Sequence, residues 1–184
     1  MDLRACFLGD SYVLGQGDVT GLGWPGRLLT SALAQGLDLT VYNLGVRGET
    51  AAQVATRGAN ECRARLRAGD KKAVVLAFGA NDISQGVSAE AAMVSLESLI
   101  AWSERQRFWT FVVSPPPMTG AKAEACAAMT KAMAQVCAKR NIAFFELGAE
   151  VADWDGWWAE AQAGDGAHPG AASYERLASA FAAW

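Results

Sequence analysis

The chain has 184 residues, of which 52% are hydrophobic and 19% are charged, and its formal net charge is −3. This length suits a single domain over residues 1–184, and the composition excludes an intrinsically disordered chain, which would be poorer in apolar residues. The slight acidity argues against a nucleic-acid-binding protein, because such proteins carry a basic surplus or a basic stripe.

Four cysteines lie far apart in the chain without any C-x-x-C spacing, namely Cys6, Cys62, Cys126 and Cys137. This pattern favours buried free thiols over a zinc site or a disulfide framework. No leader of signal-peptide length precedes the first apolar segment, and no apolar run approaches about 18 residues. We therefore expect a cytoplasmic protein without stable membrane insertion, although a secreted or periplasmic protein that has lost its leader would look the same.

Short apolar runs alternate with helical patterns along the chain. The runs of strand length are residues 4–8, 39–44, 73–78, 108–113 and 143–147. Helical patterns cover residues 24–35, 50–67, 91–105, 121–140 and a last stretch from Pro169 to about residue 180. This order predicts an α/β fold, in which right-handed crossovers build a three-layer α/β/α sandwich around a five-stranded parallel sheet.

Two segments are predicted to be loops. Residues 15–23 are rich in glycine, but their spacing is not the G-x-G-x-x-G pattern of a dinucleotide-binding turn. This segment could form one wall of a binding site and move when a ligand binds. Residues 148–164 contain Gly and Trp and are expected to form a second loop.

The first predicted strand ends in Gly9-Asp10-Ser11. This arrangement places the Ser11 hydroxyl at the carboxyl edge of the sheet, where open α/β folds bind their ligands. An ordinary turn is an equally simple interpretation, since Gly, Asp and Ser are common turn formers. A nucleophilic serine would also need a base, an orienting carboxylate and an oxyanion site.

His168 is the only histidine in the chain, and Asp165 precedes it by three residues. Histidine transfers protons near neutral pH, and one turn of chain could bring the Asp165 carboxylate onto the imidazole. The same spacing also fits an ordinary boundary between a turn and a helix. Asp153 and Asp155 are alternative orienting carboxylates, but no turn connects them to His168.

Gly48 and Asn81 follow the second and third predicted strands. A glycine N–H can approach a substrate oxygen closely, and an Asn side chain carries an amide donor. Each could instead be an ordinary turn residue. Asp10 and Asp82 are expected to accept hydrogen bonds from loop backbone groups rather than to take part in catalysis.

Four segments together resemble the sequence blocks of the SGNH/GDSL hydrolase superfamily: Gly9-Asp10-Ser11, Gly48, Gly79-Ala80-Asn81-Asp82 and Asp165-Gly166-Ala167-His168. The resemblance implies a flavodoxin-like fold and a serine hydrolase with Ser11 as nucleophile, His168 as base and Asp165 as its orienter. It also implies an oxyanion hole made by the backbone N–H groups of Ser11 and Gly48 and the Asn81 side chain. No metal or cofactor is implied.

The chain departs from the family pattern at Tyr12, where the GDSL motif has Leu, and we expect this change to affect only local packing. A G-x-S-x-G elbow is absent, so the chain does not match the common α/β-hydrolase family.

The resemblance implies hydrolysis of small-molecule carboxylic esters or thioesters, with short to medium acyl chains or lysophospholipase-like substrates. Alternatives are a carbohydrate O-deacetylase and a non-catalytic ligand-binding module on the same scaffold. Trp154, Trp157 and Trp158 could line an acyl or sugar pocket, or could simply pack in an amphipathic helix. The expected assembly is a monomer or a small homo-oligomer.

Overall fold

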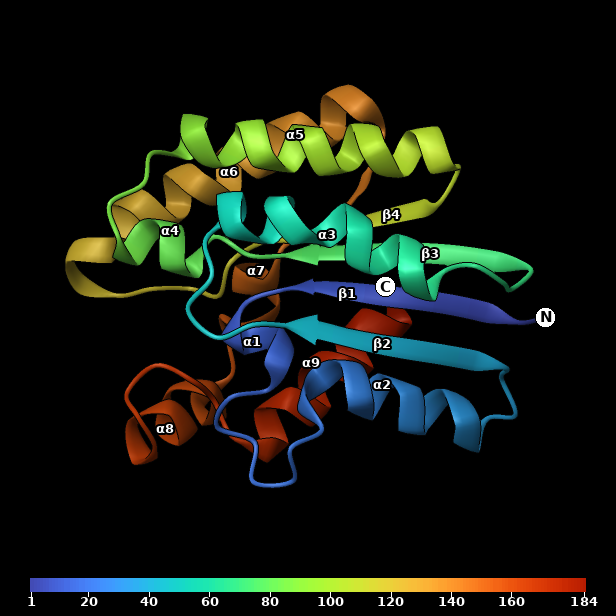
Figure 1. Cartoon of the computed structure of the whole chain (residues 1–184). Helices are drawn as coiled ribbons and strands as arrows, with labels where there is room; N and C mark the ends of the chain where they lie inside the picture. Colours follow the sequence, from blue (N-terminus) through green and yellow to red (C-terminus); the bar gives the residue numbers. More distant parts are fainter.

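The computed structural model describes residues 1–184 and contains a five-stranded parallel sheet between two layers of helices (Figure 1). The strands are β1 (Leu3–Gly9), β2 (Leu39–Gly45), β3 (Lys71–Ala77), β4 (Trp109–Val113) and β5 (Ala143–Phe145). Their order in the sheet is β2-β1-β3-β4-β5, and every neighbouring pair is parallel. The predicted three-layer α/β/α sandwich is therefore confirmed.

Helices connect the strands and cover both faces of the sheet. The helices are α1 (Ser11–Leu14), α2 (Gly23–Ala34), α3 (Ala51–Arg65), α4 (Ala80–Ser84), α5 (Ala89–Gln106), α6 (Ala123–Arg140), α7 (Leu147–Val151), α8 (Asp155–Ala163) and α9 (Ala171–Ala183). Thr50 and Gln53 form a capping box at the start of α3. None of these helices has both the length and the hydropathy to cross a lipid bilayer.

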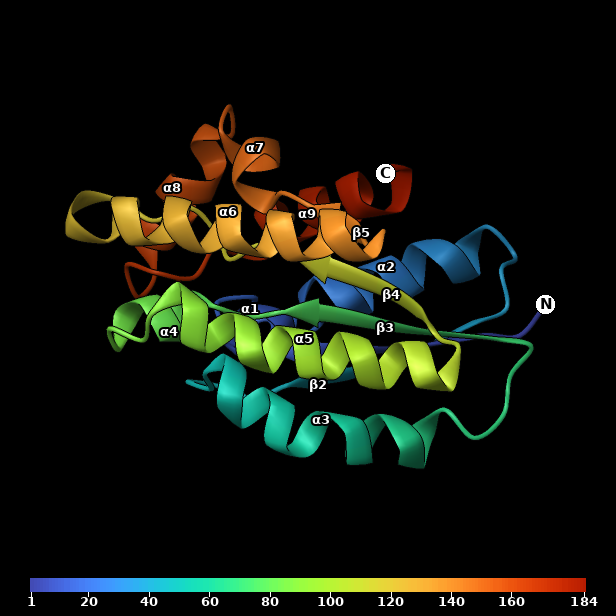
Figure 2. The ribbon, with the colours of Figure 1, turned by 90° about the horizontal axis from the view of Figure 1, so that it is seen from above.

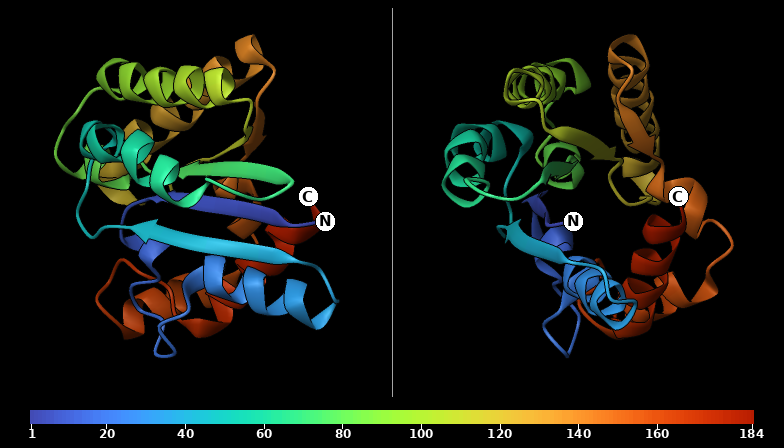
Figure 3. Two further views of the ribbon diagram at one scale, coloured as in Figure 1. Left: turned by 45° about the vertical axis from the view of Figure 1, so that its right-hand side comes forward. Right: turned by 90° about the vertical axis from the view of Figure 1, so that its right-hand side faces the viewer.

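The sheet separates two apolar layers. In β3, Val74 and Leu76 pack into the layer beneath α3, α5 and α6, whereas Ala73 and Val75 pack into the layer beneath α2 and α9. This division follows from the alternation of side chains along a strand. The two sets of helices lie on opposite faces of the sheet in Figure 2 and Figure 3. All four cysteines are buried free thiols, as predicted.

The chain order creates a switch point at the carboxyl edge of the sheet. The chain runs outward from β1 to β2 and then returns across β1 to β3, so the connections that leave β1 and β3 diverge. Open α/β sheets bind their ligands at such points. Ser11 follows the end of β1 there as the first residue of α1.

The predicted loop over residues 148–164 is wrong, because this segment contains α7 and α8. The strand predicted to end at Leu147 instead ends at Phe145, and Leu147 begins α7. Val151 and Trp157 are buried in the layer beneath α9, so burial stabilises helices that would be too short to persist alone. A further short helix, α4, follows β3 and carries Asn81.

Candidate active site

Local geometry at the end of β1 fixes the position of Ser11. A Cβ at Gly9 would collide with the carbonyl oxygen of Ala77, so the close approach of β1 and β3 requires glycine at this position. Asp10 then caps α1, and its Oδ1 accepts a hydrogen bond of 3.0 Å from the backbone N–H of Tyr12. The backbone around Ser11 is therefore fixed before the residue by the packing of Gly9 against β3 and after it by the cap of α1.

Ser11, His168 and Asp165 form a continuous chain of hydrogen bonds. The Ser11 Oγ lies 2.7 Å from His168 Nε2, although the two residues are 157 positions apart. His168 Nδ1 lies 2.7 Å from Asp165 Oδ2. The other oxygen of Asp165 accepts hydrogen bonds from the backbone N–H groups of Ala167 and His168 at 3.0 and 2.9 Å. The structure therefore brings together the three side chains that the sequence singled out.

The charge on Asp165 is stabilised by this arrangement. The backbone N–H of His168 is the main contributor that lowers the pKa of Asp165 to about 2. An ionised Asp165 favours a proton on His168 Nδ1, which leaves Nε2 able to accept the Ser11 proton. Asp153 and Asp155 are exposed and make no hydrogen bond to the imidazole, so of the three carboxylates only Asp165 contacts the His168 ring.

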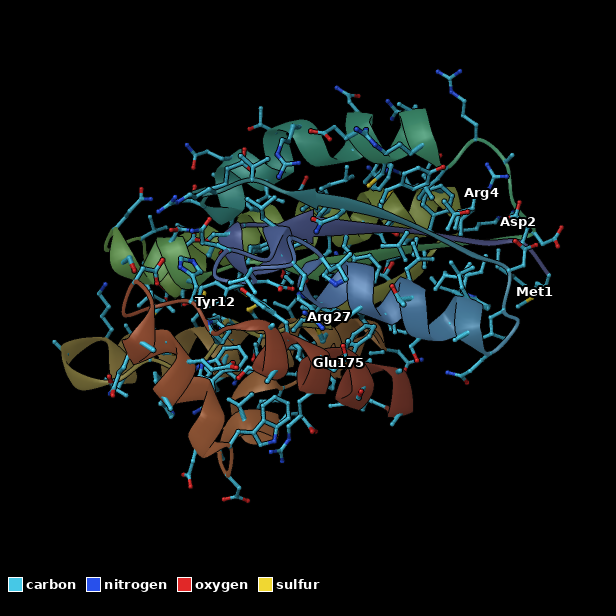
Figure 4. The ribbon with its side chains drawn as sticks, turned by 90° about the horizontal axis from the view of Figure 1, so that it is seen from below. Met1, Asp2, Arg4, Tyr12, Arg27 and Glu175 are labelled. Atoms are coloured by element: carbon cyan, nitrogen blue, oxygen red, sulfur yellow. The ribbon has the colours of Figure 1, made fainter.

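Two further residues, Tyr12 and Gly17, contact His168 or its neighbours in the loop. The Tyr12 ring lies 4.7 Å from the imidazole, measured between ring centroids, and the Tyr12 hydroxyl donates a hydrogen bond of 3.0 Å to the Ala167 carbonyl. Figure 4 shows Tyr12 at the end of the molecule opposite Met1, which is the carboxyl edge of the sheet. Behind His168, Gly17 packs so closely that a Cβ there would collide with the carbonyl oxygen of Pro169.

The glycine-rich segment supports the site from behind rather than facing it. Residues 15–23 do not line the cleft beside Ser11, so the expectation that they form its facing wall is wrong. Asp18 in this segment forms an ion pair of 3.1 Å with Arg27 of α2. Arg27 forms another of 2.8 Å with Glu175 of α9, and both of these side chains are labelled in Figure 4. The Tyr174 hydroxyl also donates to the Gln16 carbonyl, at 2.9 Å. These contacts direct the segment toward α2, α9 and Pro169.

Two of the three expected oxyanion donors are free of hydrogen bonds, and the third is already hydrogen-bonded within the chain. The backbone N–H groups of Ser11 and Gly48 donate to no acceptor within the chain, and Gly48 has a φ of 84°, which favours glycine. The Asn81 amide donates to the Glu49 carbonyl at 3.0 Å and to Asp10 Oδ2 at 3.3 Å. Asn81 lines the cleft, whereas Gly48 is exposed outside its lining.

A cleft of about 240 Å³ opens beside Ser11. It is lined by α1, α4, the segment from Pro117 to Lys122, Trp158 and the loop that carries His168. Lys122 Nζ donates a hydrogen bond of 3.1 Å to the Ser84 hydroxyl in this lining. Trp154 and Trp157, in contrast, are only 5% and 1% exposed and belong to the core.

Sequence reasoning missed Arg57, which connects the strand ends to the loop that carries Gly48. Its guanidinium donates to the carbonyls of Gly9 and Leu44 at 3.2 and 2.8 Å, and to the Glu49 carboxylate at 2.7 Å. No local pattern distinguishes this residue from the other arginines of α3, because its partners lie on β1, β2 and the following loop.

Asp10 and Asp82 accept backbone hydrogen bonds, as expected. Asp82 accepts a hydrogen bond of 2.9 Å from the Ala51 N–H, and burial raises the pKa of its carboxyl. Burial likewise raises the pKa of Asp10 to about 7. The side chains of His, Cys, Asp and Glu form no cluster of three or more that could hold a metal ion.

Comparisons with known proteins identify the family. Residues 7–176 match the model of the GDSL-like lipase/acylhydrolase family. No curated protein matches the chain at a significant level.

Several solved structures share the fold at low sequence identity. Axe2, an acetylxylan esterase from Geobacillus stearothermophilus, has a TM-score of 0.82 at 20% identity, over 97% of this chain and 91% of that chain. A G-D-S-L family protein from Desulfitobacterium hafniense DCB-2 has a TM-score of 0.78 at 19% identity, over 97% of both chains. AlinE4, an SGNH-hydrolase family esterase, has a TM-score of 0.69 at 21% identity, over 84% of this chain and 82% of that chain. Because the family model covers most of the sequence, the chain belongs to the GDSL-like lipase/acylhydrolase family and is a carboxylic ester hydrolase.

Proposed function

We propose that this protein, acting as one domain over residues 1–184, hydrolyses short to medium acyl esters or thioesters through Ser11, His168 and Asp165. The observation that carries the proposal is the pair of 2.7 Å contacts that joins the Ser11 hydroxyl to the Asp165 carboxylate through the imidazole. Nucleophile, base and orienter lie within hydrogen-bond reach of one another in serine hydrolases.

The reaction begins when the Ser11 Oγ attacks the ester carbonyl carbon while His168 Nε2 takes the hydroxyl proton. The carbonyl oxygen becomes an oxyanion, and collapse of the tetrahedral intermediate breaks the bond to the leaving alcohol or thiol, which receives the proton from His168. Water then attacks the acyl-enzyme and gives its proton to His168. Release of the carboxylic acid returns that proton to Ser11.

The unpaired backbone N–H groups of Ser11 and Gly48 support their roles as oxyanion donors, because each is free to donate a hydrogen bond to the substrate oxygen. Asn81 would contribute by breaking the longer of its two hydrogen bonds, the one of 3.3 Å to Asp10 Oδ2, and by donating to the oxyanion instead. Backbone donors that the fold orients before charge develops, such as those of Ser11 and Gly48, stabilise the transition state most effectively.

The fold relatives lend support to the roles of Asp165 and His168. Two catalytic mutants of Axe2 replace an aspartate and a histidine that are three positions apart. Asp165 and His168 have the same spacing. A non-catalytic binding module is disfavoured because all three side chains are present and connected.

Carbohydrate O-deacetylation is the second candidate, and the lining of the cleft favours it. Trp158 offers an aromatic surface, and Ser84, Thr119 and Lys122 offer hydrogen-bonding groups in the same open cleft. This combination of an aromatic surface and hydrogen-bonding groups suits the sugar portion of an acetyl ester, which carries several hydroxyl groups, better than a long acyl chain. Axe2 is itself described as an acetylxylan esterase.

Activity measurements on single variants test the proposal. Ser11→Ala and His168→Ala should each lower kcat on p-nitrophenyl acetate by more than about 10³-fold while far-UV circular dichroism stays unchanged. Asp165→Ala should also lower kcat, whereas Asp153→Ala removes an exposed carboxylate outside the site and should not. Unchanged turnover in Ser11→Ala would refute the proposed function.

A panel of substrates separates the two candidates. Wild-type kcat/KM on p-nitrophenyl esters of graded acyl length, on the corresponding thioesters and on acetylated xylooligosaccharides identifies the preferred class. A strong preference for the acetylated sugars would favour the deacetylase. A preference for butyryl to octanoyl esters would favour the general esterase.

A further inference from the structure

The loop between α8 and α9 carries both Asp165 and His168, yet much of it is exposed. Residues 164–167 are all solvent-exposed. The loop is attached on the α8 side by hydrogen bonds from the Gly164 N–H to the Glu160 carbonyl at 3.1 Å and from the Gly166 N–H to the Ala161 carbonyl at 2.8 Å. On the side that faces Ser11, its position has to be held by other contacts.

Tyr12 supplies these contacts from the residue directly after Ser11. Its hydroxyl donates to the Ala167 carbonyl at 3.0 Å, and its ring is tilted by 41° against the imidazole at a centroid distance of 4.7 Å. One side chain on α1 therefore touches two successive residues of the loop. The GDSL motif has Leu at this position, which could pack against the imidazole but could not donate a hydrogen bond.

We propose that Tyr12 is a positioning residue that holds the loop of Asp165 and His168 at hydrogen-bond distance from Ser11. This inference rests on the proposed function. Without the hydroxyl, the exposed loop would spend less time in the arrangement that allows proton transfer. The net value of one neutral hydrogen bond corresponds to a decrease in kcat of about threefold to tenfold.

Removal of single hydroxyl groups tests this role. Tyr12→Phe keeps the ring against His168 and removes only the donor to Ala167. Tyr42→Phe is the matched control, since Tyr42 lies on β2 outside the lining of the cleft and packs against the layer beneath α3, α5 and α6. We expect both variants to stay folded, with a threefold to tenfold lower kcat only for Tyr12→Phe. Its KM should stay within about twofold of wild type, because the lining of the cleft is retained.

Expressing kcat per serine titrated with a fluorophosphonate separates positioning from a loss of folded protein. Tyr12→Leu, which restores the motif residue, should lower kcat at least as much as Tyr12→Phe. A wild-type kcat in Tyr12→Phe, with His168→Ala inactive, would overturn the role of Tyr12 and leave the proposed function standing. A fully active His168→Ala would overturn both. Equal losses of kcat in Tyr12→Phe and Tyr42→Phe would overturn the specific role of Tyr12.

Discussion

At the scale of single residues, the Asp10 carboxyl is subject to two opposing effects, because burial disfavours its ionised form whereas its hydrogen bonds favour that form. It is only 1% exposed, it caps α1 and it accepts a hydrogen bond from Asn81. Burial nevertheless dominates and raises the pKa of Asp10 to about 7, above its ordinary value of 3.8. The native state therefore holds a proton on Asp10 at pH values where the unfolded chain has released it.

This difference predicts a pH dependence of stability. Because the native state binds more protons than the unfolded state between about pH 4 and pH 7, the free energy of unfolding should fall as the pH rises through this window. Asp165 and Asp18 titrate near pH 2 in the native state, so their contributions are lost only at more acidic pH. Asp10→Asn keeps a capping oxygen and removes the titration.

Urea denaturation at several pH values between 5 and about 8 measures the effect. Wild-type stability should decrease with pH, and the slope should be smaller in Asp10→Asn. Some slope should remain, since burial also raises the pKa of Asp82. Identical slopes in the two proteins would show that Asp10 does not carry a raised pKa.

At the scale of elements, the segment over residues 15–23 shows how glycine fixes the active-site geometry. Gly17 has a φ of 91°, and a Cβ there would also lie 3.2 Å from the Cβ of His168. Gly21 has a φ of 69° in the same segment, but a Cβ there would meet no atom within 4 Å. The two positions share a positive φ, which would strain a residue with a Cβ, but they differ in the atoms that lie beside them.

Alanine substitutions at these two glycines should therefore separate strain from displacement. Gly21→Ala should cost about 1 kcal/mol of stability through its positive φ and leave kcat unchanged. Gly17→Ala should cost more and should also lower kcat, because the new methyl group displaces Pro169 and His168 from their positions beside Ser11. Equal stability and equal kcat in the two variants would contradict the packing of Gly17 against His168.

The same scale shows which elements the sequence could predict. Each strand lies within two residues of its predicted bounds, because an apolar run of that length between Gly or Pro residues has few other interpretations. Helices α7 and α8 could not be predicted, since Gly148 and Gly156 suggest a loop and their stability comes from burial beneath α9. Propensity is overridden here by tertiary packing.

The candidate site divides in a similar way. Ser11, Asp165 and His168 were recognisable because each lies in a short motif at a strand end or a helix start. Tyr12, Gly17 and Arg57 were not, because their partners lie on other elements: the Tyr12 hydroxyl, for example, contacts a carbonyl 155 positions away. Local periodicity carries no information about contacts of this range.

At the scale of the whole molecule, one sheet joins two apolar layers that are built from different parts of the chain. The layer beneath α3, α5 and α6 includes Leu96, which is 0% exposed, and the layer beneath α2 and α9 includes Leu177, which is 2% exposed. Strands β1 and β3 contribute side chains to both layers. Ser11 and His168 meet at the edge of this shared sheet, so unfolding of either layer should also move the Ser11 hydroxyl away from the His168 imidazole.

If residues 1–184 form one domain, both layers should unfold together. Leu96→Ala and Leu177→Ala should each lower the free energy of unfolding by about 2–5 kcal/mol, whereas Leu33→Ala, at a side chain that is 56% exposed, should change it by less than about 0.5 kcal/mol. Tryptophan fluorescence and far-UV circular dichroism should give coincident urea transitions in all three variants, with activity lost in the same transition. A variant in one layer that splits the curve into two steps would show that the layers unfold separately. Coincident curves follow from the shared sheet, because neither layer can expose its face of β1 and β3 without removing the support of the other.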